Sequence, residues 1–405
     1  MIYIIFIIYI FLELLYIIRY LILFIKLNNK KIKYDKISKN MKKAFLNDLY
    51  TNNYNYLNIE NIFFNKLQIQ NINKKDIIKT YYEISTNYYK NLKYLKVLSK
   101  IFDKIEKKHK LIFSKTSLMS KNRLKWKKMT LNSLYSPFLF DTLKLFLRIY
   151  RNNYLYNSGF TKHNLNKNYI IWTNKYDIKK GIPIIFFHCS VGGLVFYEKL
   201  LNQWGDKFNL ILPEIPGISW QNDTSELPSM KEMTNMLFNF LTNNYGNIDK
   251  FIIVGHSLGS NICSYVINSN PNIICKVLLI EPGVFIPDLL INFSDFNNLS
   301  ILDINISELI YFPIYYGSIF VQYYFQREFS LNNMLFSDIL KKLKLDIHFI
   351  YSGDDKKLIP KYQINYIIEN NIKCKYTIFK KYTHGSLINK HKMINYCTEI
   401  LKKWI

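Results

Sequence analysis

One segment constrains the fold of this chain more than any other: residues 251–259, Phe-Ile-Ile-Val-Gly-His-Ser-Leu-Gly. Its first four residues are aromatic or β-branched, which predicts a strand, and a helical stretch from Gly259 to Asn268 follows. Gly255 and Gly259 flank Ser257 at two residues on either side, although the whole chain has only 13 glycines. Small residues at this spacing let the backbone approach closely where a strand turns sharply into a helix. The segment therefore predicts a strand-to-helix elbow with Ser257 at its tip.

Short apolar runs alternate with helical stretches from about Asn168 onward. With 49% hydrophobic residues in 405, the chain can bury a full core. The expected strands cover residues 169–173, 182–188, 208–213, 251–255, 276–280, 347–352 and 376–380. The expected helices cover residues 195–204, 230–243, 259–268, 361–369 and 387–403. Strands that alternate with crossover helices predict an α/β fold with a mostly parallel sheet.

Met1 to Ile25 is almost continuously apolar, and only Glu13 and Arg19 interrupt it. At about 1.5 Å per residue, such a helix can cross a hydrocarbon core of roughly 30 Å. A cleaved secretory signal would have a basic start, a shorter apolar run and a small-residue cleavage site, and none is visible. We therefore expect residues 1–26 to be a retained single-pass membrane anchor, with the lipid bilayer as partner. Glu13 is then protonated, paired, or a sign of a shallow interfacial helix.

A one-sided basic flank follows this segment, made of Lys26, Lys30, Lys31, Lys33, Lys36, Lys39, Lys42 and Lys43. By the positive-inside rule, this flank places the rest of the chain on the cytoplasmic side. The whole chain carries a formal net charge of +26, from 55 basic and 29 acidic residues. Such a charge favours anionic partners, but the richness in Ile, Asn, Tyr and Lys, all with A+T-rich codons, accounts for much of it. We therefore do not expect nucleic acid as a partner.

A basic, mainly helical region is expected at residues 27–165, ahead of an α/β domain at residues 166–405. Apolar residues recur at helical spacing from Lys74 to Lys104, which predicts a long amphipathic helix with a Lys-rich outer face. The Asn-rich residues 51–73 are predicted to be a linker. A second basic stretch, residues 107–128, is interleaved with Leu, Ile, Phe and Trp and lies either on anionic lipid headgroups or in solvent.

A serine hydroxyl is a weak nucleophile at neutral pH and needs a general base to take its proton. At an elbow of this kind, the acid and the histidine follow the serine in chain order. Five of the seven histidines precede the serine or lie in the elbow or an expected strand: His109, His163, His188, His256 and His348. His384 follows the last expected strand, whereas His391 lies inside the last helix. We therefore expect His384 to be the general base for Ser257.

The acid should follow the penultimate strand, where Ser352-Gly-Asp-Asp355 supplies two carboxylates after a glycine turn. Asp355 is the first choice, and Asp354 is the closest alternative. Glu281, at the end of the preceding strand, is a third candidate, because an acid there also approaches the same histidine. Whichever carboxylate serves, it orients His384 and stabilises its imidazolium.

Two backbone N–H groups are expected to stabilise the oxyanion that forms when a serine attacks a carbonyl group. One belongs to Leu258, the residue after the nucleophile. The other belongs to the loop after the strand at residues 182–188, where Gly192-Gly193 supports a special backbone conformation. Ser190 is the expected donor in that loop, and Cys189 is less favoured.

The five cysteines are scattered and include no CxxC pair, which argues against a disulfide framework or a zinc site. Acylation of a serine needs neither a metal nor an organic cofactor. We therefore expect no cofactor.

Six segments together resemble the α/β-hydrolase superfamily, and more narrowly its membrane-anchored branch. They are 186–194 Phe-Phe-His-Cys-Ser-Val-Gly-Gly-Leu, 212–219 Leu-Pro-Glu-Ile-Pro-Gly-Ile-Ser, 255–259 Gly-His-Ser-Leu-Gly, 281–285 Glu-Pro-Gly-Val-Phe, 352–355 Ser-Gly-Asp-Asp and 383–385 Thr-His-Gly. The resemblance covers about Asn168 to Ile405 and implies a mostly parallel sheet flanked by helices, with a lid or cap at about residues 287–343. Cys189 departs from the pattern, because the family usually has His-Gly in its early loop.

The resemblance also implies a serine esterase or lipase acting on small-molecule or lipid esters. Ser257 would be the acylated nucleophile, Asp355 the acid and His384 the base. An apolar cap beside a membrane anchor favours a hydrophobic acyl substrate. Two alternatives stay open: an acyltransferase that uses the same acyl-enzyme, and a catalytically silent member that binds lipid or a partner.

Overall fold

The computed structural model describes residues 2–29, 37–51, 74–75, 78, 81, 92–109, 138–190, 192–220, 227–246, 248–285, 323–324, 328, 330–343, 345–356 and 358–405. Most of the expected linker, residues 110–128 of the basic stretch and residues 287–322 of the expected lid lie outside these ranges.

Strands of the described chain form one eight-stranded sheet in the order β1-β2-β4-β3-β5-β6-β7-β8. They are β1 (Phe160–Asn164), β2 (Ile170–Asn174), β3 (Ile184–Phe187), β4 (Leu210–Glu214), β5 (Phe251–His256), β6 (Ile274–Ile280), β7 (Asp346–Ser352) and β8 (Lys375–Phe379). β2 pairs antiparallel with β1 and β4, whereas all later neighbours pair in parallel. The predicted fold class is confirmed, and each expected strand is present within two residues at either end.

β1 is the strand that sequence patterning did not predict. It pairs with β2 from Phe160 opposite Asn174 to Asn164 opposite Ile170, at the edge of the sheet. Of its five residues only Phe160 is buried, so no apolar run marks the strand in the sequence. The sheet therefore begins ahead of residue 166, the expected start of the α/β domain.

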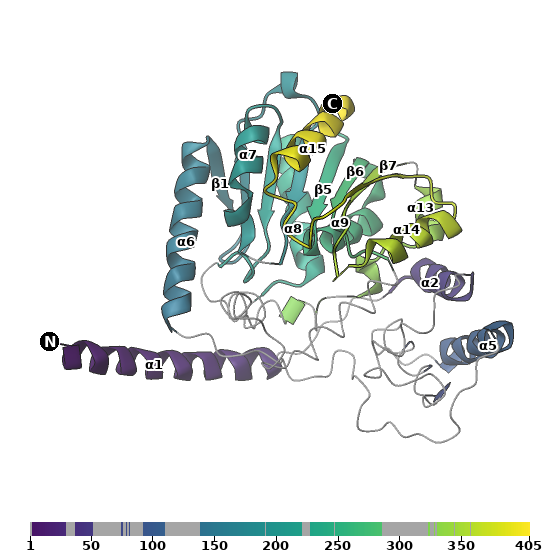
Figure 1. Ribbon diagram of the computed structural model, residues 1–405, viewed down its shortest axis with the longest axis horizontal. Helices are drawn as coiled ribbons and strands as arrows, with labels where there is room; N and C mark the ends of the chain where they lie inside the picture. Colours follow the sequence, from purple (N-terminus) through teal and green to yellow (C-terminus); the bar gives the residue numbers. More distant parts are fainter. Residues whose placement is uncertain are drawn as a thin grey trace.

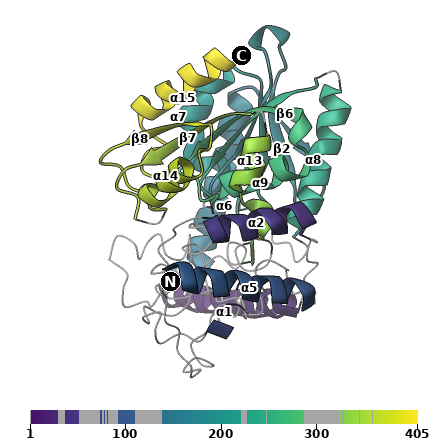
Figure 2. The ribbon, with the colours of Figure 1, turned by 90° about the vertical axis from the view of Figure 1, so that its right-hand side faces the viewer.

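Helices cover both faces of the sheet (Figure 1, Figure 2). They are α6 (Phe138–Asn157), α7 (Glu198–Gly205), α8 (Met230–Tyr245), α9 (Leu258–Ser269), α13 (Ser337–Lys342), α14 (Pro360–Glu369) and α15 (His391–Trp404), with the 3-10 turns η2 (Ile178–Lys180), η3 (Gly193–Tyr197), η4 (Pro271–Ile273) and η7 (Leu331–Asn333). One buried cluster joins α8, α9, α13 and α14 to one face, and a second joins α6, α7 and α15 to the other. Successive strand residues alternate between them, so Ile253 belongs to the first cluster and Ile252 to the second.

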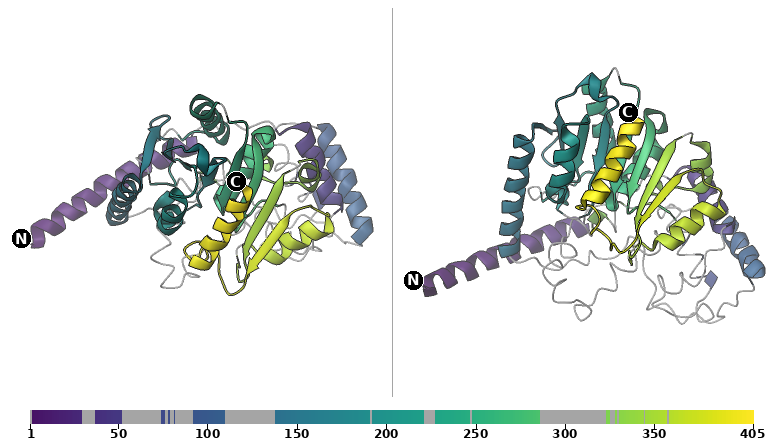
Figure 3. Two further views of the ribbon diagram at one scale, coloured as in Figure 1. Left: turned by 90° about the horizontal axis from the view of Figure 1, so that it is seen from above. Right: turned by 45° about the horizontal axis from the view of Figure 1, so that its top comes forward.

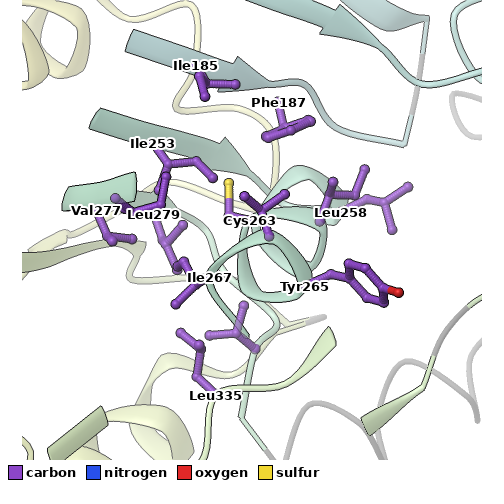
Figure 4. Close-up of a cluster of buried hydrophobic side chains, with 14 of the residues drawn as sticks. Ile185, Phe187, Ile253, Leu258, Cys263, Tyr265, Ile267, Val277, Leu279 and Leu335 are labelled. Atoms are coloured by element: carbon purple, nitrogen blue, oxygen red, sulfur yellow. The ribbon is translucent and has the colours of Figure 1, made fainter. Parts of the chain in front are cut away.

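α9 is held against the sheet by the first cluster. Figure 4 shows Leu258, Cys263 and Ile267 of this helix beside Ile253 and Leu279 of the central strands. All five side chains are buried. Truncating one such Leu or Ile to Ala costs about 2–5 kcal/mol, so this packing firmly fixes the helix that follows the elbow.

α1 (Ile2–Asn29) extends beyond the α/β domain (Figure 1, Figure 3). Its stretch Ile7–Leu27 has a mean hydropathy of 2.2 over 21 residues. Among the described residues, this is the one helix long and apolar enough to cross a membrane by length and composition. Near its end, Leu27 is buried with Leu227 and Tyr323, so part of α1 contacts the body of the protein.

α2 (Lys39–Thr51) docks the N-terminal region onto the α/β domain. Its Asp48 is fully buried and accepts hydrogen bonds from the N–H and hydroxyl groups of Ser337 and from the hydroxyl of Tyr366. Phe45 of α2 contacts the ring of Tyr81, which in turn contacts Phe102 of α5 (Leu92–His109). α5 overlaps the second half of the amphipathic helix expected at residues 74–104 and ends five residues later.

Candidate active site

Ser257 lies at the tip of a sharp turn between β5 and α9. Its φ of 52° and ψ of −118° belong to a region that non-glycine residues rarely adopt. A Cβ on Gly255 would lie 2.6 Å from Sγ of Cys263, and a Cβ on Gly259 would lie 2.2 Å from the carbonyl oxygen of Phe187. Both glycines are therefore required by close approach, which is the physical basis of the Gly-x-Ser-x-Gly spacing.

A hydrogen-bonded chain links this serine to a histidine and a carboxylate. Oγ of Ser257 lies 2.9 Å from Nε2 of His384, and Nδ1 of His384 lies 2.7 Å from Oδ2 of Asp355. The residues follow β5, β8 and β7 respectively, and the carboxyl ends of these parallel strands meet at the same edge of the sheet. Because the carboxylate holds Nδ1–H, Nε2 is the ring nitrogen left to accept the serine proton. The structure thus joins the three residues that the sequence suggested as nucleophile, base and acid.

The structure also separates the three candidate acids. Asp355 is buried, and its second oxygen accepts a hydrogen bond from the N–H of Leu358 at 2.9 Å. Asp354 is exposed. Glu281 is buried, but its Oε2 accepts the backbone N–H of Gly385 at 2.7 Å rather than the imidazole of His384. Asp355 is therefore the carboxylate bonded to the candidate base.

A second buried chain lies beside the first. Nε2 of His256 is 2.8 Å from Oε2 of Glu281, and its Nδ1 is 2.6 Å from the hydroxyl of Tyr197. That hydroxyl accepts the N–H of Cys189 at 2.8 Å, while Glu281 accepts the N–H that follows His384. The ring of His256 stacks with that of His384, with centroids 6.4 Å apart. This chain therefore ties the loop after β3 to the loop that carries the candidate base.

His256 and Glu281 form a charged pair at neutral pH. Burial lowers the pKa of His256, but the side chain of Cys189 and the carboxylate of Glu281 outweigh it and raise the pKa to about 9. Burial raises the pKa of Glu281, but the hydrogen bond and charge of His256 outweigh it and lower the pKa to about 2. The imidazolium and the carboxylate thus stabilise each other inside the protein.

The loop after β3 is shaped to present backbone N–H groups. Gly192 and Gly193 have φ of 63° and 60°, and a Cβ on Gly193 would lie 2.8 Å from the side chain of Ser219. The N–H of Cys189 donates to the hydroxyl of Tyr197 at 2.8 Å, and Ser190 as the oxyanion donor of this loop stays a prediction. Leu258 is the first residue of α9, so its N–H has no acceptor within the helix.

His188 anchors the same loop from below. Its Nε2 accepts the N–H of Ile215 at 2.9 Å and bonds the hydroxyl of Ser219 at 2.8 Å, and its Nδ1 lies 2.7 Å from the carbonyl oxygen of Cys189. Burial lowers the pKa of His188 to about 3, so this ring is neutral and bonds through both nitrogens. It is a structural histidine, as its position before Ser257 in the chain suggested.

Sequence reasoning did not find Tyr197, the pairing of His256 with Glu281, or the buried ion pair between Arg151 and Glu214. A signal exists for the acids, because Glu214 and Glu281 each end an apolar strand, where an ionisable residue is costly unless paired. No signal in one sequence identifies their partners.

Within the described ranges, no group of three or more His, Cys, Asp or Glu side chains is placed to hold a metal ion. The five cysteines are free thiols at separate places. The expectation that the reaction uses no cofactor remains a prediction.

The strand order with an antiparallel β2, the glycine-flanked elbow and the Ser-His-Asp geometry define this chain as an α/β-hydrolase-fold protein with a site of the serine hydrolase type. No family model and no curated protein matches its sequence.

Solved structures resemble the chain at low sequence identity. A serine hydrolase from the polyaromatic hydrocarbon-degrading bacterium Cycloclasticus zankles is similar with a TM-score of 0.44 and 15% identity, over 60% of this chain and 97% of that one. A membrane phospholipase A, described as a bacterial virulence factor, is similar with a TM-score of 0.47 and 12% identity, over 65% and 93%. Naproxen esterase from Bacillus subtilis is similar with a TM-score of 0.45 and 12% identity, over 65% and 98%.

Proposed function

We propose that this protein is a serine hydrolase that cleaves carboxylic esters through an acyl-enzyme on Ser257. One observation carries the proposal: the hydroxyl of a strained elbow serine is hydrogen-bonded to His384, which is itself held by a buried carboxylate. A surface serine needs neither the strain nor the two aligned partners. Their combination is what activation of a nucleophile requires.

In the proposed reaction, Oγ of Ser257 attacks the ester carbonyl carbon while Nε2 of His384 takes the hydroxyl proton. Asp355 stabilises the imidazolium, and the N–H groups of Leu258 and Ser190 stabilise the oxyanion. His384 then gives its proton to the leaving alcohol, and the acyl group remains on the serine. Water, deprotonated by the same nitrogen, releases the carboxylic acid and restores the hydroxyl.

We further propose that the ester belongs to a lipid and that α1 holds the enzyme at a membrane, with the catalytic domain on the cytoplasmic side. The apolar surface of α1 supports attachment to a membrane, and the basic flank that begins at Lys26 favours the anionic cytoplasmic leaflet. The carboxyl ends of the parallel strands, where Ser257 lies, face the side of the molecule on which α1 runs (Figure 1). A substrate held in the bilayer would thus be near the site.

Labelling with a fluorophosphonate probe tests the activated serine without knowledge of the substrate. Detergent-solubilised wild type should react, whereas Ser257→Ala should not, and His384→Ala should react at least about 100-fold more slowly. Asp355→Ala should also be slow, and its matched control is Asp354→Ala, which removes the neighbouring exposed carboxylate and should label normally. Ser158→Ala, an exposed serine far along the chain, controls for serine loss.

Failure of folded wild type to label would contradict the acyl-enzyme and favour a silent fold that binds lipid or a partner. If labelling holds, product analysis with water or an added alcohol as the acceptor separates a hydrolase from an acyltransferase.

A further inference from the structure

α6 exposes large apolar side chains, whereas its charged side chains are half-buried or buried, the reverse of an ordinary surface helix. Its exposed large apolar residues are Leu139, Leu143, Leu145, Phe146, Ile149, Tyr150 and Tyr156. Leu139 and Phe146 are 64% and 62% exposed. All four charged residues of the helix are less exposed than these apolar residues. We call these seven apolar residues the α6 face.

The inward charges fix the rotation of α6. Arg151 is buried, with Nη1 2.9 Å from Oε2 of Glu214 and 2.7 Å from the carbonyl oxygen of Ser219. Arg148 donates to the carbonyl oxygen of Trp220 at 3.2 Å. Turning the helix to hide the α6 face would break the buried ion pair, which costs several kcal/mol. The outward position of the α6 face is therefore built into the fold.

α1 meets α6 at the first residue of α6. The N–H of Phe138 donates to Oε2 of Glu13 at 3.2 Å, and the ring of Phe138 lies edge-on to that of Tyr16, with centroids 5.8 Å apart. A carboxylate at a helix N-terminus is favoured by the unpaired N–H groups and the helix dipole. Glu13 thus has a partner, and its depth is tied to that of α6.

We propose that the α6 face and α1 form one membrane-binding surface, on which the protein is monotopic: α1 enters a single leaflet and Glu13 lies at headgroup level. This proposal rests on membrane anchoring by α1 and deepens it. The N-terminal end of α1 projects past α6 on the side away from the sheet (Figure 1, Figure 3), the side to which the α6 face turns.

The depth follows from the length of helix beyond Glu13. Residues 2–12 rise about 16 Å, roughly half of a hydrocarbon core. After Glu13, one side of α1 contacts the body through Leu23, Phe24 and Leu27. The other side exposes Leu14, Leu15, Ile18, Leu21, Ile22 and Ile25. Because the last turns of α1 contact protein on one side, only its first half is open to lipid on all sides, and α1 enters the bilayer by this half.

Lipid fits this surface better than a protein partner does. Ile7 to Leu12 is exposed on all sides of the helix, whereas the α6 face is a stripe on a helix that lies across it. A folded partner would have to enclose one helix and also lie flat on another. The hydrocarbon core and the headgroup boundary of a bilayer can solvate both the first half of α1 and the α6 face, because lipid needs no complementary shape.

Depth measurements on the full chain test the proposal. The variants Ile7→Cys, Ile18→Cys, Phe146→Cys and Ile368→Cys carry nitrobenzoxadiazole on the introduced cysteine. In their background Cys189, Cys275 and Cys374 are replaced by Ser, and the buried Cys263 and Cys397 are kept. Vesicles of phosphatidylcholine and phosphatidylglycerol contain lipids with a nitroxide at carbon 5 or carbon 12 of the acyl chain. Ile368, 58% exposed on α14, is the matched control.

We expect the deep nitroxide to quench the label at position 7 best, and the shallow nitroxide to quench those at 18 and 146 best. The label at 368 should stay in water. A label at 18 deeper than that at 7 would show a spanning α1 and overturn the proposal. A label at 146 that stays in water while position 7 is quenched would also overturn it, leaving the anchor intact. If no label enters the bilayer, the anchor itself fails.

The double variant Leu143→Glu/Phe146→Glu gives an independent readout. It should partition onto the same vesicles at least about tenfold more weakly than wild type, because two apolar side chains leave the lipid boundary. Ile368→Glu should partition as wild type does. If the fluorescence emission of the label at 146 shifts with protein concentration in the absence of vesicles, the α6 face would be assigned to a second copy of the chain.

Discussion

At the residue scale, the site depends on places where only one side chain fits. Ser257 adopts its strained φ because Gly255 and Gly259 let β3, β5 and α9 approach within the space of a methyl group. Buried packing around α9 maintains this strained backbone conformation, in which the hydroxyl of Ser257 lies within hydrogen-bond distance of His384. Geometry and chemistry at this position are therefore inseparable.

Gly259→Ala should test this requirement. The new Cβ would overlap the carbonyl oxygen of Phe187, so β3 and its loop must shift, and we expect a loss of about 3 kcal/mol or more of unfolding free energy. Probe labelling of Ser257 should fall with it. Gly205→Ala is the control, because its Cβ would meet only ring atoms of Phe160 at 3.5 Å. Equal urea midpoints for the two variants would contradict the close-approach argument.

The pair of His256 and Glu281 predicts a pH dependence of stability. The pKa of His256 is raised from 6.5 to about 9, so its contribution is complete below pH 6.5 and is lost as the pH rises through about 9. The pKa of Glu281 is lowered from 4.5 to about 2. The stability that its ionised form contributes is therefore complete above pH 4.5 and is lost as the pH falls through about 2. Guanidinium unfolding at pH 6 and pH 10 should show a wild-type loss of roughly 3 kcal/mol.

Glu281→Gln keeps an oxygen for the N–H of Gly385 and removes the charge that faces His256. We expect it to be destabilised by roughly 3 kcal/mol at pH 6, because one partner of a buried pair is gone. It should show little further loss at pH 10. A variant that loses as much stability as wild type between the two pH values would show that another group titrates there.

At the element scale, the strands and the elbow could be predicted from the sequence because each depends on local patterning. β3 is apolar throughout and β5 is apolar up to Gly255 and His256, as is typical of strands covered on both faces. β1 could not be predicted, because it is an edge strand with one buried residue. The partner of Asp48 could not be predicted either, because Ser337 lies 289 positions away.

Ser257, His384 and Asp355 of the candidate site could be named because chain order and strand ends locate them. The chain through Tyr197, His256 and Glu281 depends on tertiary contacts alone.

Docking of α2 gives a prediction at this scale. Asp48→Ala removes the acceptor for hydrogen bonds from Ser337 and Tyr366, and should cost about 2–3 kcal/mol. Asp48→Asn keeps an acceptor and should cost less. Burial raises the pKa of Asp48 above its usual 3.8, so the ionised form is disfavoured and wild-type stability falls as the pH rises above 3.8. In urea unfolding at pH 4 and pH 7, the Asn variant should lack this decrease in stability. An unchanged decrease would show that another group causes it.

At the scale of the whole molecule, the proposed membrane surface and the proposed site belong to one arrangement. α6 contributes its inner side to the core through Tyr154 and Leu155 and its outer side to the α6 face. Its first residue meets α1 on the side of the molecule where the parallel strands end (Figure 1). A surface that orients the domain on a bilayer would therefore also orient Ser257 toward esters held in that bilayer.

This orientation can be measured by comparing two substrates. Wild type and Leu143→Glu/Phe146→Glu should cleave a dispersed short-chain ester at the same rate, because the α6 face does not contact the triad. On an ester embedded in vesicles, the double variant should be about tenfold slower, because less enzyme is bound and what is bound is no longer held by α6. Ile368→Glu, an exposed apolar-to-charge change on α14, should match wild type on both substrates. A loss on both substrates would mean that the fold or the site is damaged, and an equal rate on vesicles would mean that α1 alone delivers the enzyme to its substrate.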